Sequence, residues 1–264
     1  MIELSGIYVY PVKSLRGLSL RETAITGGRL PGDRSWVLVD AENQFMHQRD
    51  YPQMARIDVS AEGSGIVLRM PHLPELPLTP RQFTQSSTPI TYVKLWRRSA
   101  PVAHVAPHAD EWLTAALGVA CRLMEFVPDE PALTVPDYET HASLHDATPF
   151  HLTSEESLQD LNARMATPIP MNRFRPNLVV RGAEPYAEDR WKSFAIGDNR
   201  FRWIKQCTRC VATMTDQETG IRSRYEPLLS LSRYRREGSE VVFGHYVVAD
   251  HWGGQLRLGD PVTL

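Results

Sequence analysis

Two of the three cysteines of this chain lie close together, in the segment Cys207-Thr208-Arg209-Cys210. From Phe201 to Gln206, the residues before them alternate between two sets, Phe201, Trp203 and Lys205 on one side and Arg202, Ile204 and Gln206 on the other, which predicts a β-strand. Residues 211–215 look like a second short extended segment, followed by the turn-forming run 216–220. A cysteine held on a sheet beside the cation Arg209 is favoured in its thiolate form. Because thiolate sulfur is a soft ligand, the pattern is typical of a site for a soft transition metal.

The Cys-x-x-Cys spacing alone leaves other interpretations open. A structural zinc site needs four Cys or His ligands, and the chain has no second Cys-x-x-Cys pair. A thioredoxin-type redox pair belongs at the start of a helix in a βαβ unit, whereas this pair follows a predicted strand. A plain pair of buried small residues also fits the local spacing.

The composition of the 264-residue chain is that of an ordinary globular protein. It is 42% hydrophobic and 23% charged, with a net charge of −2, which argues against bulk nucleic-acid binding. Three cysteines are too few for a disulfide framework and fit a reducing compartment. The first residues lack a signal peptide, and no apolar run approaches the ~20 residues of a membrane span. We therefore expect a cytoplasmic protein with no membrane or nucleic-acid partner.

Short strands dominate the rest of the chain. Turn residues separate them every eight to twelve positions in the first half, which favours a barrel or sandwich over a βαβ array. Helices are expected at 109–117, ending at Gly118, from Thr153, whose Thr-Ser-Glu-Glu run resembles a capping box, and within 222–236. The Pro- and Asp-rich segment 125–136 predicts a boundary. The expected fold is mainly β with some α (α+β), divided into domains 1–125 and 126–264.

Several separated motifs, in a specific order, resemble the MOSC family and cover most of the chain. The first half carries Tyr10-Pro11-Val12-Lys13-Ser14 and Gly32-Asp33-Arg34-Ser35-Trp36-Val37-Leu38-Val39. The second half carries Arg173-Phe174-Arg175-Pro176-Asn177, Tyr186-Ala187-Glu188-Asp189-Arg190-Trp191, Cys207-Thr208-Arg209-Cys210, Asp216-x-x-Thr219-Gly220, Phe243-Gly244-x-Tyr246 and Gly259-Asp260-Pro261-Val262. The resemblance implies an amino-terminal MOSC β-barrel domain followed by a MOSC domain, built on a β-barrel with flanking helices, that binds the molybdenum cofactor.

The same resemblance implies roles for individual residues. Cys210 would ligate molybdenum, a thiolate added to a site already rich in cofactor sulfur. Cys207 would be structural or support the site, and Cys121 is expected in the core. Asp216 and Tyr246 lie at motif positions near the metal cysteine, and are candidates for proton relay or orientation; for Asp216 the alternative is to cap a turn. The cofactor-binding positions are Lys13, Ser14, Arg34, Arg175 and Asn177, where arginine suits an anionic group.

Within this family the chain resembles the mitochondrial amidoxime-reducing component and its bacterial relatives. The resemblance therefore implies an oxidoreductase that reduces N-hydroxylated compounds (hydroxylamines, amidoximes and N-hydroxylated bases) to amines and water, a detoxification reaction. The chain has no ferredoxin cysteines and no flavin or nicotinamide motif, so electrons would come from a separate one-electron donor such as a ferredoxin, a flavodoxin or a cytochrome b5-like protein with a flavin reductase. Two alternatives remain: a sulfur carrier or sulfurtransferase with a persulfide on Cys210, and a non-catalytic cofactor carrier. His145, His151 and His245 lie near the candidate segments without an assigned role.

Overall fold

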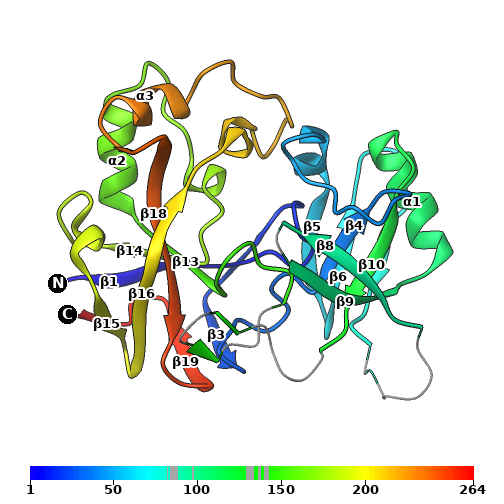
Figure 1. The fold of residues 1–264 in the computed structure, drawn as a ribbon, viewed down its shortest axis with the longest axis horizontal. Helices are drawn as coiled ribbons and strands as arrows, with labels where there is room; N and C mark the ends of the chain where they lie inside the picture. Colours follow the sequence, from blue (N-terminus) through cyan, green and yellow to red (C-terminus); the bar gives the residue numbers. More distant parts are fainter. Residues whose placement is uncertain (82, 84–88, 97, 129–133, 136–137, 140–142) are drawn as a thin grey trace.

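A computed structural model describes residues 1–81, 83, 89–96, 98–128, 134–135, 138–139 and 143–264. It confirms the expected mainly β fold. Figure 1 shows two bodies side by side, one around a large sheet and one around smaller sheets with helix α1 (Pro107–Leu117). No helix within the described ranges is long and apolar enough to cross a bilayer.

The large sheet has nine strands in the described residues, most of them from the second half of the chain. Along the sheet the strands run in the order β2 (Leu18–Leu20), β1 (Glu3–Val9), β14 (Leu178–Arg181), β13 (Phe150–Ser154), β18 (Glu240–Ala249), β16 (Asn199–Thr208), β15 (Ser193–Ile196) and β20 (Val262–Thr263), with β17 (Arg236–Glu237) beside β18. β13 and β14 are parallel, while β16 and β18 form a long antiparallel pair.

The first two strands of the chain belong to this sheet and not to the body that most of the first half builds. β1 pairs antiparallel with β14, so that Ile7 lies opposite Leu178. β3 (Glu22–Thr26) likewise pairs with β19 (Gly253–Arg257). The division into domains at residue 125 stays a prediction, and the structure adds that the two halves of the chain share strands.

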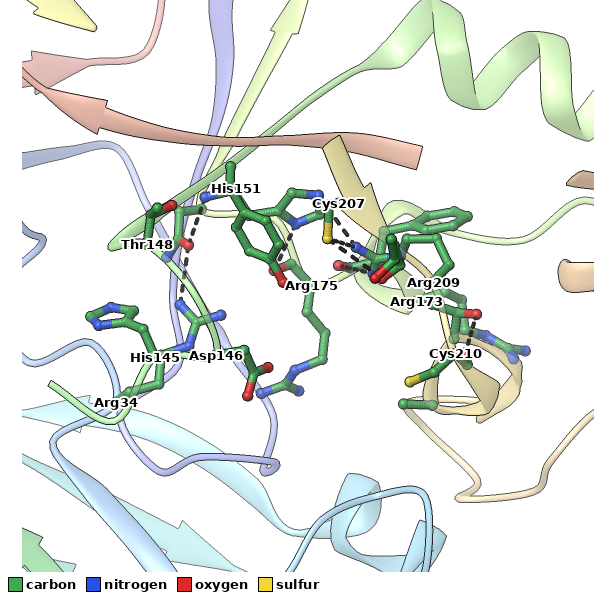
Figure 2. Close-up of a pocket in the computed structure, with 16 residues that line it drawn as sticks. Arg34, His145, Asp146, Thr148, His151, Arg173, Arg175, Cys207, Arg209 and Cys210 are labelled. Carbon is green, nitrogen blue, oxygen red and sulfur yellow. Dashed lines mark hydrogen bonds between the residues drawn. The ribbon is translucent and has the colours of Figure 1, made fainter. Parts of the chain in front are cut away.

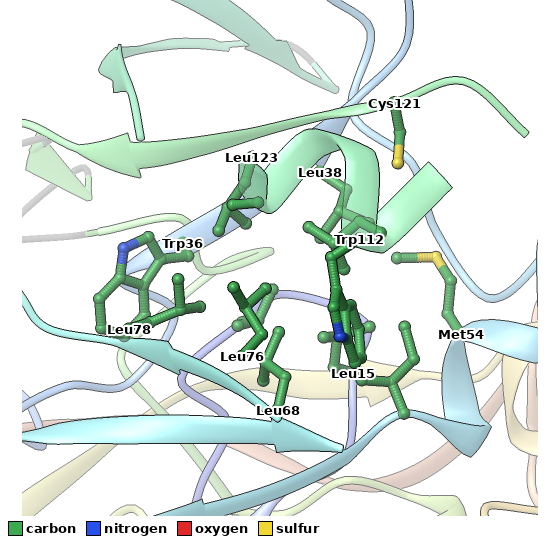
Figure 3. Close-up of a cluster of buried hydrophobic side chains, with 14 of the residues drawn as sticks. Leu15, Trp36, Leu38, Met54, Leu68, Leu76, Leu78, Trp112, Cys121 and Leu123 are labelled. Atoms are coloured by element: carbon green, nitrogen blue, oxygen red, sulfur yellow. The ribbon is translucent and has the colours of Figure 1, made fainter. Parts of the chain in front are cut away.

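The second body is built from short antiparallel sheets. One has the order β4 (Trp36–Val39), β10 (Arg122–Phe126), β9 (Arg98–His104) and β8 (Thr91–Leu95), and another has β5 (Asp58–Glu62), β6 (Gly65–Arg69) and β7 (Leu76–Leu78). β11 (Thr134–Val135) lies in the segment 125–136 predicted as a boundary, and it pairs with β12 (Tyr138–Glu139) just beyond that segment. The buried side chains of α1 pack with the strands, as Figure 3 shows for Trp112, Leu38 and Leu68.

Two of the expected helices form close to where the sequence predicts them. α1 ends at Leu117, and Gly118 follows with a φ of 69°, the left-handed cap that glycine allows. α2 (Glu155–Ala163) begins one residue later than expected, because the Oγ of Ser154, not of Thr153, accepts from the Ser157 backbone N–H. α3 (Leu228–Ser232) is the helix expected within 222–236. Short 3₁₀ helices complete the connections: η1 (Pro52–Arg56), η2 (Met171–Arg173), η3 (Ala187–Arg190) and η4 (Val211–Met214).

The predicted extended segment at 211–215 is wrong. Those residues form η4, because the carbonyl of Cys210 accepts hydrogen bonds from the Thr213 N–H (3.1 Å) and the Thr213 hydroxyl (2.9 Å). Two bonds to one carbonyl turn the chain at once after the strand. Cys210 is therefore the residue at which β16 gives way to a tight turn.

Candidate functional site

The two cysteines of the Cys-x-x-Cys segment face different surroundings. Cys207 is the ninth residue of β16 and is 2% exposed, whereas Cys210, just past the strand and at the turn into η4, is exposed. The backbone N–H of Arg209 donates to the Val241 carbonyl at 2.7 Å, which holds the segment against β18. The sulfur that a ligand can reach is that of Cys210.

Arg209 turns its guanidinium toward Cys207 and away from the exposed cysteine (Figure 2). Its Nη1 donates to the Cys207 sulfur, and its Nη2 donates to the Phe174 carbonyl at 2.7 Å. Burial, and then the neighbouring Cys207, raise the pKa of the Tyr246 phenol, so Tyr246 stays protonated at neutral pH. The expected pairing of a cation with a cysteine thus occurs at the buried member of the pair.

Two adjoining pockets meet at Cys210. The first, of about 130 Å³, is here named the arginine pocket and is lined by Arg34, His145, Asp146, Thr148, His151, Arg173, Phe174, Arg175, Asn177, Cys207, Thr208, Arg209, Cys210, Ala212, Thr213 and Tyr246 (Figure 2). The second, of about 110 Å³, is named the aromatic pocket and is lined by Lys13, Ser14, Arg34, Phe45, His47, Gln48, Arg49, Trp96, Asp146, Arg175, Cys210 and Ala212. The pockets share five residues and form one cleft with an exposed thiol at their junction.

The guanidinium groups of Arg34 and Arg175 both pack against the ring of Tyr10. Their guanidinium carbons lie 4.6 Å and 4.2 Å from the centroid of the Tyr10 ring, and the Arg175 Nη1 donates to the Leu15 carbonyl at 2.6 Å. Burial, with Arg34 nearby, lowers the pKa of Arg175 to about 10, which leaves it charged at neutral pH. Two fixed positive charges thus face the cleft from a common support.

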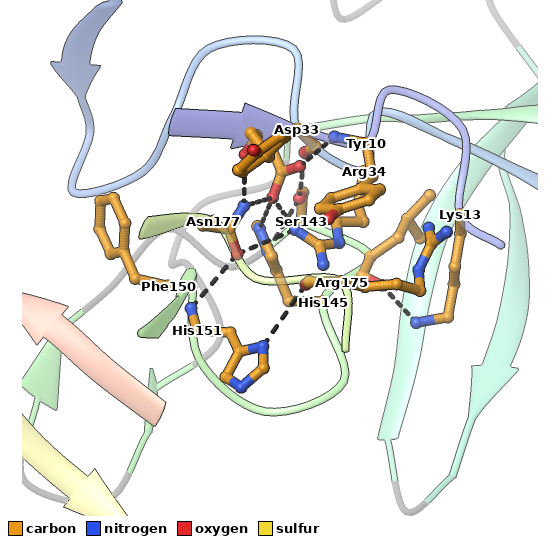
Figure 4. A network of polar contacts seen from close by, with 12 residues as sticks. Tyr10, Lys13, Asp33, Arg34, Ser143, His145, Phe150, His151, Arg175 and Asn177 are labelled. Carbon is orange, nitrogen blue, oxygen red and sulfur yellow. Dashed lines mark hydrogen bonds and ion pairs between the residues drawn. The ribbon is translucent and has the colours of Figure 1, made fainter. Parts of the chain in front are cut away.

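A buried polar network anchors Arg34 from behind (Figure 4). The Asp33 carboxylate accepts from the Tyr10 backbone N–H (2.6 Å) and the Asn177 amide (3.1 Å), and it pairs with Arg34. The Nε2 of His145 lies 2.9 Å from the same carboxylate. Burial opposes ionisation of Asp33, but Arg34 and His145 outweigh it and lower its pKa to about 2. Asp33 is therefore ionised, and it fixes the orientation of the Arg34 fork.

Asn177 joins this network to the neighbouring strand. Its side-chain oxygen accepts from Arg34 (3.1 Å) and from the His151 backbone N–H (3.2 Å), while its amide nitrogen also donates to the Tyr8 carbonyl. Burial, and then Arg209, hold the pKa of His151 well below its usual value. His151 is neutral, so it adds no charge to the arginine pocket.

Backbone strain gathers around the cleft. Of the seven non-glycine residues with positive φ in the described ranges, four line the two pockets: Ser14 (71°), Arg34 (48°), Trp96 (56°) and Arg175 (54°). Residues other than glycine rarely adopt a positive φ. Such a conformation persists where the surrounding structure imposes it, often at functional sites.

Lys13 is buried and reaches the cleft through an ion pair. Its Nζ donates to the Leu144 carbonyl (2.9 Å) and to the Asp146 carboxylate (2.5 Å). Burial opposes ionisation of Asp146, but Lys13 lowers its pKa below the usual range. Ser14, next in sequence, lines the aromatic pocket, and its carbonyl accepts from the Gln48 amide at 2.7 Å.

The predicted site residues divide between the cleft and its surroundings. Lys13, Ser14, Arg34, Arg175, Asn177, Cys210 and Tyr246 all line one pocket or both. Asp216 lines neither: its carboxylate accepts from Glu218 and Thr219 in its own turn, and from Arg173 at 2.9 Å. Its direct role in the chemistry stays a prediction, and the contacts observed are those of a turn cap that also holds Arg173.

The donor set fits a bound anion that carries its own metal ligands. No group of three or more His, Cys, Asp or Glu side chains that could hold a metal occurs in the part of the chain that the structure describes. The Nε atoms of Arg173 and Arg209, both residues of the arginine pocket, are buried without a hydrogen-bond partner. One exposed sulfur, fixed cations and two unpaired Nε donors therefore fit an anionic group that brings its own metal.

Comparison with known proteins gives the family. Residues 1–120 match the model of the MOSC N-terminal beta barrel domain, and residues 139–263 match that of the MOSC domain. The chain is 31% identical to mitochondrial amidoxime-reducing component 1 of Mus musculus, over 99% of this chain and 82% of that protein. The chain belongs to the MOSC family. Another member, mitochondrial amidoxime reducing component 2 of Rattus norvegicus, is 32% identical over 98% of this chain and 82% of its own length.

Among solved structures, the YuaD protein from Bacillus subtilis covers 99% of this MOSC protein and 94% of its own chain. Its sequence identity is 12% and the TM-score is 0.46. YiiM from Geobacillus stearothermophilus covers 44% of this chain and 54% of its own, with a TM-score of 0.33 and 15% identity.

Proposed function

We propose that this protein is a molybdenum cofactor-dependent reductase of N-hydroxylated compounds. The observation that carries the proposal is the exposed Cys210 sulfur at the junction of two pockets, one of which is lined by Arg34, Arg173, Arg175 and Arg209. The names of the relatives, amidoxime-reducing components, support the reaction class. A pocket beside the metal position is what an enzyme needs and a carrier does not.

The residues of the cleft would divide the task of holding the cofactor. The thiolate of Cys210 would bind the metal, and Lys13, Ser14, Arg34, Arg175 and Asn177 would bind the phosphate and the pterin. Arginine forks suit a phosphate because they donate two parallel hydrogen bonds. The cofactor supplies the two-electron reduction of the N–O bond.

The chain itself would position the substrate. Reduction of an N-hydroxyl group to an amine consumes two electrons and two protons and releases water. Tyr246 lines the arginine pocket, and we propose that its phenol, which stays protonated, donates a hydrogen bond that orients the substrate. Asp216 would act through Arg173 as a positioning residue. The electrons would come from a separate one-electron donor, a ferredoxin, a flavodoxin or a cytochrome b5-like protein with its flavin reductase, and the cytoplasm remains the proposed compartment.

Elemental analysis of protein made in a molybdate-fed host tests the proposal, with Cys210→Ser and Cys207→Ser as a matched pair. We expect about one molybdenum per native chain, loss of the metal in Cys210→Ser, and retention in Cys207→Ser, because Cys210 is exposed whereas Cys207 is buried and accepts a hydrogen bond from Arg209. Reduction of benzamidoxime by a chemical electron donor then tests the reaction. A native chain without molybdenum from such a host overturns the assignment.

A sulfur carrier with a persulfide on Cys210 is the second candidate. The exposure of the Cys210 sulfur favours it, because a carried sulfur must be handed to another molecule. Release of thiocyanate when the purified protein is treated with cyanide would reveal such a sulfur. Its loss in Cys210→Ser, together with an absence of molybdenum, would establish this alternative over the reductase.

A further inference from the structure

Three aromatic side chains form one wall of the aromatic pocket. Phe45 and Trp96 meet edge to face with ring centroids 4.9 Å apart, and Phe45 meets His47 in the same way at 5.2 Å. The His47 and Trp96 rings are nearly parallel, with an interplanar angle of 12° and centroids 5.9 Å apart. The cluster is therefore a compact π-rich surface.

The chain holds Trp96 over the cleft at a cost. It lies directly after β8, where that strand turns toward β9, with a φ of 56° that is unfavourable for a bulky residue. Its indole N–H donates to the Asp146 carboxylate at 3.0 Å, and the Arg49 guanidinium carbon lies 4.0 Å from its ring centroid. Despite these contacts, Trp96 is 43% exposed. A large aromatic side chain that is anchored but left open to solvent suits contact with a ligand.

The same pocket also contains the reactive end of the cleft. Cys210 lines it together with Trp96, and the Asp146 carboxylate joins the wall to Lys13. Cations line both pockets, but the buried unpaired Nε donors of Arg173 and Arg209 belong to the arginine pocket alone, where they suit an anion, whereas the three rings belong to the aromatic pocket alone. The two pockets thus offer different chemistry on either side of one sulfur.

We propose that the wall of Phe45, His47 and Trp96 is the substrate subsite, and that it selects N-hydroxylated compounds whose N–OH group is carried by a planar aromatic or heteroaromatic ring. This rests on the proposed reductase function. The ring packs against the wall while the N–OH group points toward Cys210. The Asp146 carboxylate accepts a hydrogen bond from the N–H or O–H of that group. Small aliphatic hydroxylamines and amidoximes have no ring to stack, so they bind less well.

The test compares benzamidoxime with acetamidoxime, which carry the same N–OH group with and without a ring. The variants are Trp96→Ala, Trp96→Phe and, as a matched control, Trp252→Ala, since Trp252 is similarly exposed (46%) and lines neither pocket. We expect Trp96→Ala to lower the ratio of kcat/KM for benzamidoxime to that for acetamidoxime on the order of 10-fold, the range for one stacking partner, mainly through KM. Trp96→Phe restores most of the ratio, and Trp252→Ala leaves it at the native value.

A binding measurement separates this proposal from the reductase function. Benzamidoxime is titrated by calorimetry into the cofactor-loaded protein without an electron donor, and we expect its Kd to rise by the same order of magnitude in Trp96→Ala. An unchanged Kd, or equal losses for the two substrates, overturns the subsite. Loss of molybdenum from Trp96→Ala also overturns it, because the wall would then support the pterin. If the native protein binds benzamidoxime through Trp96 but reduces neither compound, the reductase function fails and the subsite stands.

Discussion

The two pockets that meet at Cys210 are built in different ways. The arginine pocket is backed by buried polar groups, in which Asp33, Asn177 and His145 are at most 2% exposed and hydrogen-bonded to one another or to Arg34. The wall of the aromatic pocket consists of two half-buried rings, Phe45 and His47, and the exposed ring of Trp96 at the turn between β8 and β9. The arginine pocket is thus held by buried groups of the core, whereas the aromatic wall lies at the more exposed edge of the cleft.

The difference corresponds to two demands on a cofactor enzyme. A cofactor with several charged and polar groups needs partners in fixed positions, because each misplaced donor leaves a buried group unsatisfied. A substrate surface gains from stacking, which tolerates variation in the ring it receives. Changes among the buried groups of the arginine pocket should therefore lower stability and cofactor content together, while changes in the wall of Phe45, His47 and Trp96 should alter selectivity.

Gly244→Ala is expected to have the largest effect on the rigid side. A Cβ there would lie 2.6 Å from both the His151 ring and the Leu152 carbonyl, at a φ of 74°. We expect a loss of about 2–5 kcal/mol in the free energy of unfolding, from backbone strain and overpacking combined. Gly238→Ala is the control, because Gly238 also has positive φ (59°) but nothing within 4 Å, and it should cost only about 1–2 kcal/mol. If urea denaturation gave equal losses of unfolding free energy for the two variants, the close approach of His151 and Leu152 to Gly244 would not contribute to stability.

Acid should weaken the same side through His145. Burial is the main cause that lowers its pKa, to about 4, so between pH 6.5 and 4 the unfolded chain binds a proton that the folded chain does not. Stability should therefore fall by about 3 kcal/mol from this group as the pH drops across that window. His145→Gln should flatten the curve of unfolding free energy against pH by a similar amount. An unaltered slope in the variant would assign the acid sensitivity to other groups.

Arg34→Ala should reduce cofactor retention roughly 10- to 100-fold, the worth of one charge-assisted pair of hydrogen bonds. Arg34→Lys keeps the charge without the planar fork, so its cofactor retention should lie between that of Arg34→Ala and that of the native protein. Exposed Arg200→Ala serves as the surface control. Molybdenum per chain after dialysis measures all four proteins. Full metal content in Arg34→Ala would break the assignment of this pocket to the cofactor.

On the aromatic side, Arg49→Ala should have the smallest effect. It removes a guanidinium from the face of Trp96, a contact worth about 0.5–1 kcal/mol at an exposed site. We expect little change in molybdenum content and a KM for benzamidoxime that shifts by roughly two- to five-fold. A large loss of molybdenum in Arg49→Ala would contradict the assignment of the aromatic wall to the substrate and not to the cofactor.

Much of the charged lining of the cleft could be predicted from the sequence. Lys13, Arg34, Arg175 and Cys210 were predicted because they lie in ordered motifs, and the structure places them in one cleft, although Lys13 lines only its aromatic pocket. Such residues follow or precede strands, so a linear motif records part of their geometry. Asp33 belongs to one of these motifs, but nothing local shows that its carboxylate is buried and anchors Arg34.

The aromatic side could not be predicted in this way. Phe45 and His47 come from one loop after β4, Trp96 comes from the turn after β8, and Asp146 comes from a loop in the second half of the chain, so their contacts arise only in the folded protein. No periodicity marks them, because none lies on a regular face of an element. The error at 211–215 has a different, local origin, since two hydrogen bonds to the Cys210 carbonyl outweigh the strand propensity of the residues.

The pairing of β1 with β14 has a consequence for how the protein is made. The Ser5 hydroxyl donates to the Val179 carbonyl across a sequence separation of 174 residues. During synthesis, β1 must wait for β14 to leave the ribosome, with one edge unpaired and open to wrong partners. Contacts between such distant residues also slow folding, since a long loop must close before they form. The beginning of this chain reaches its native place only after two thirds of the protein has been made.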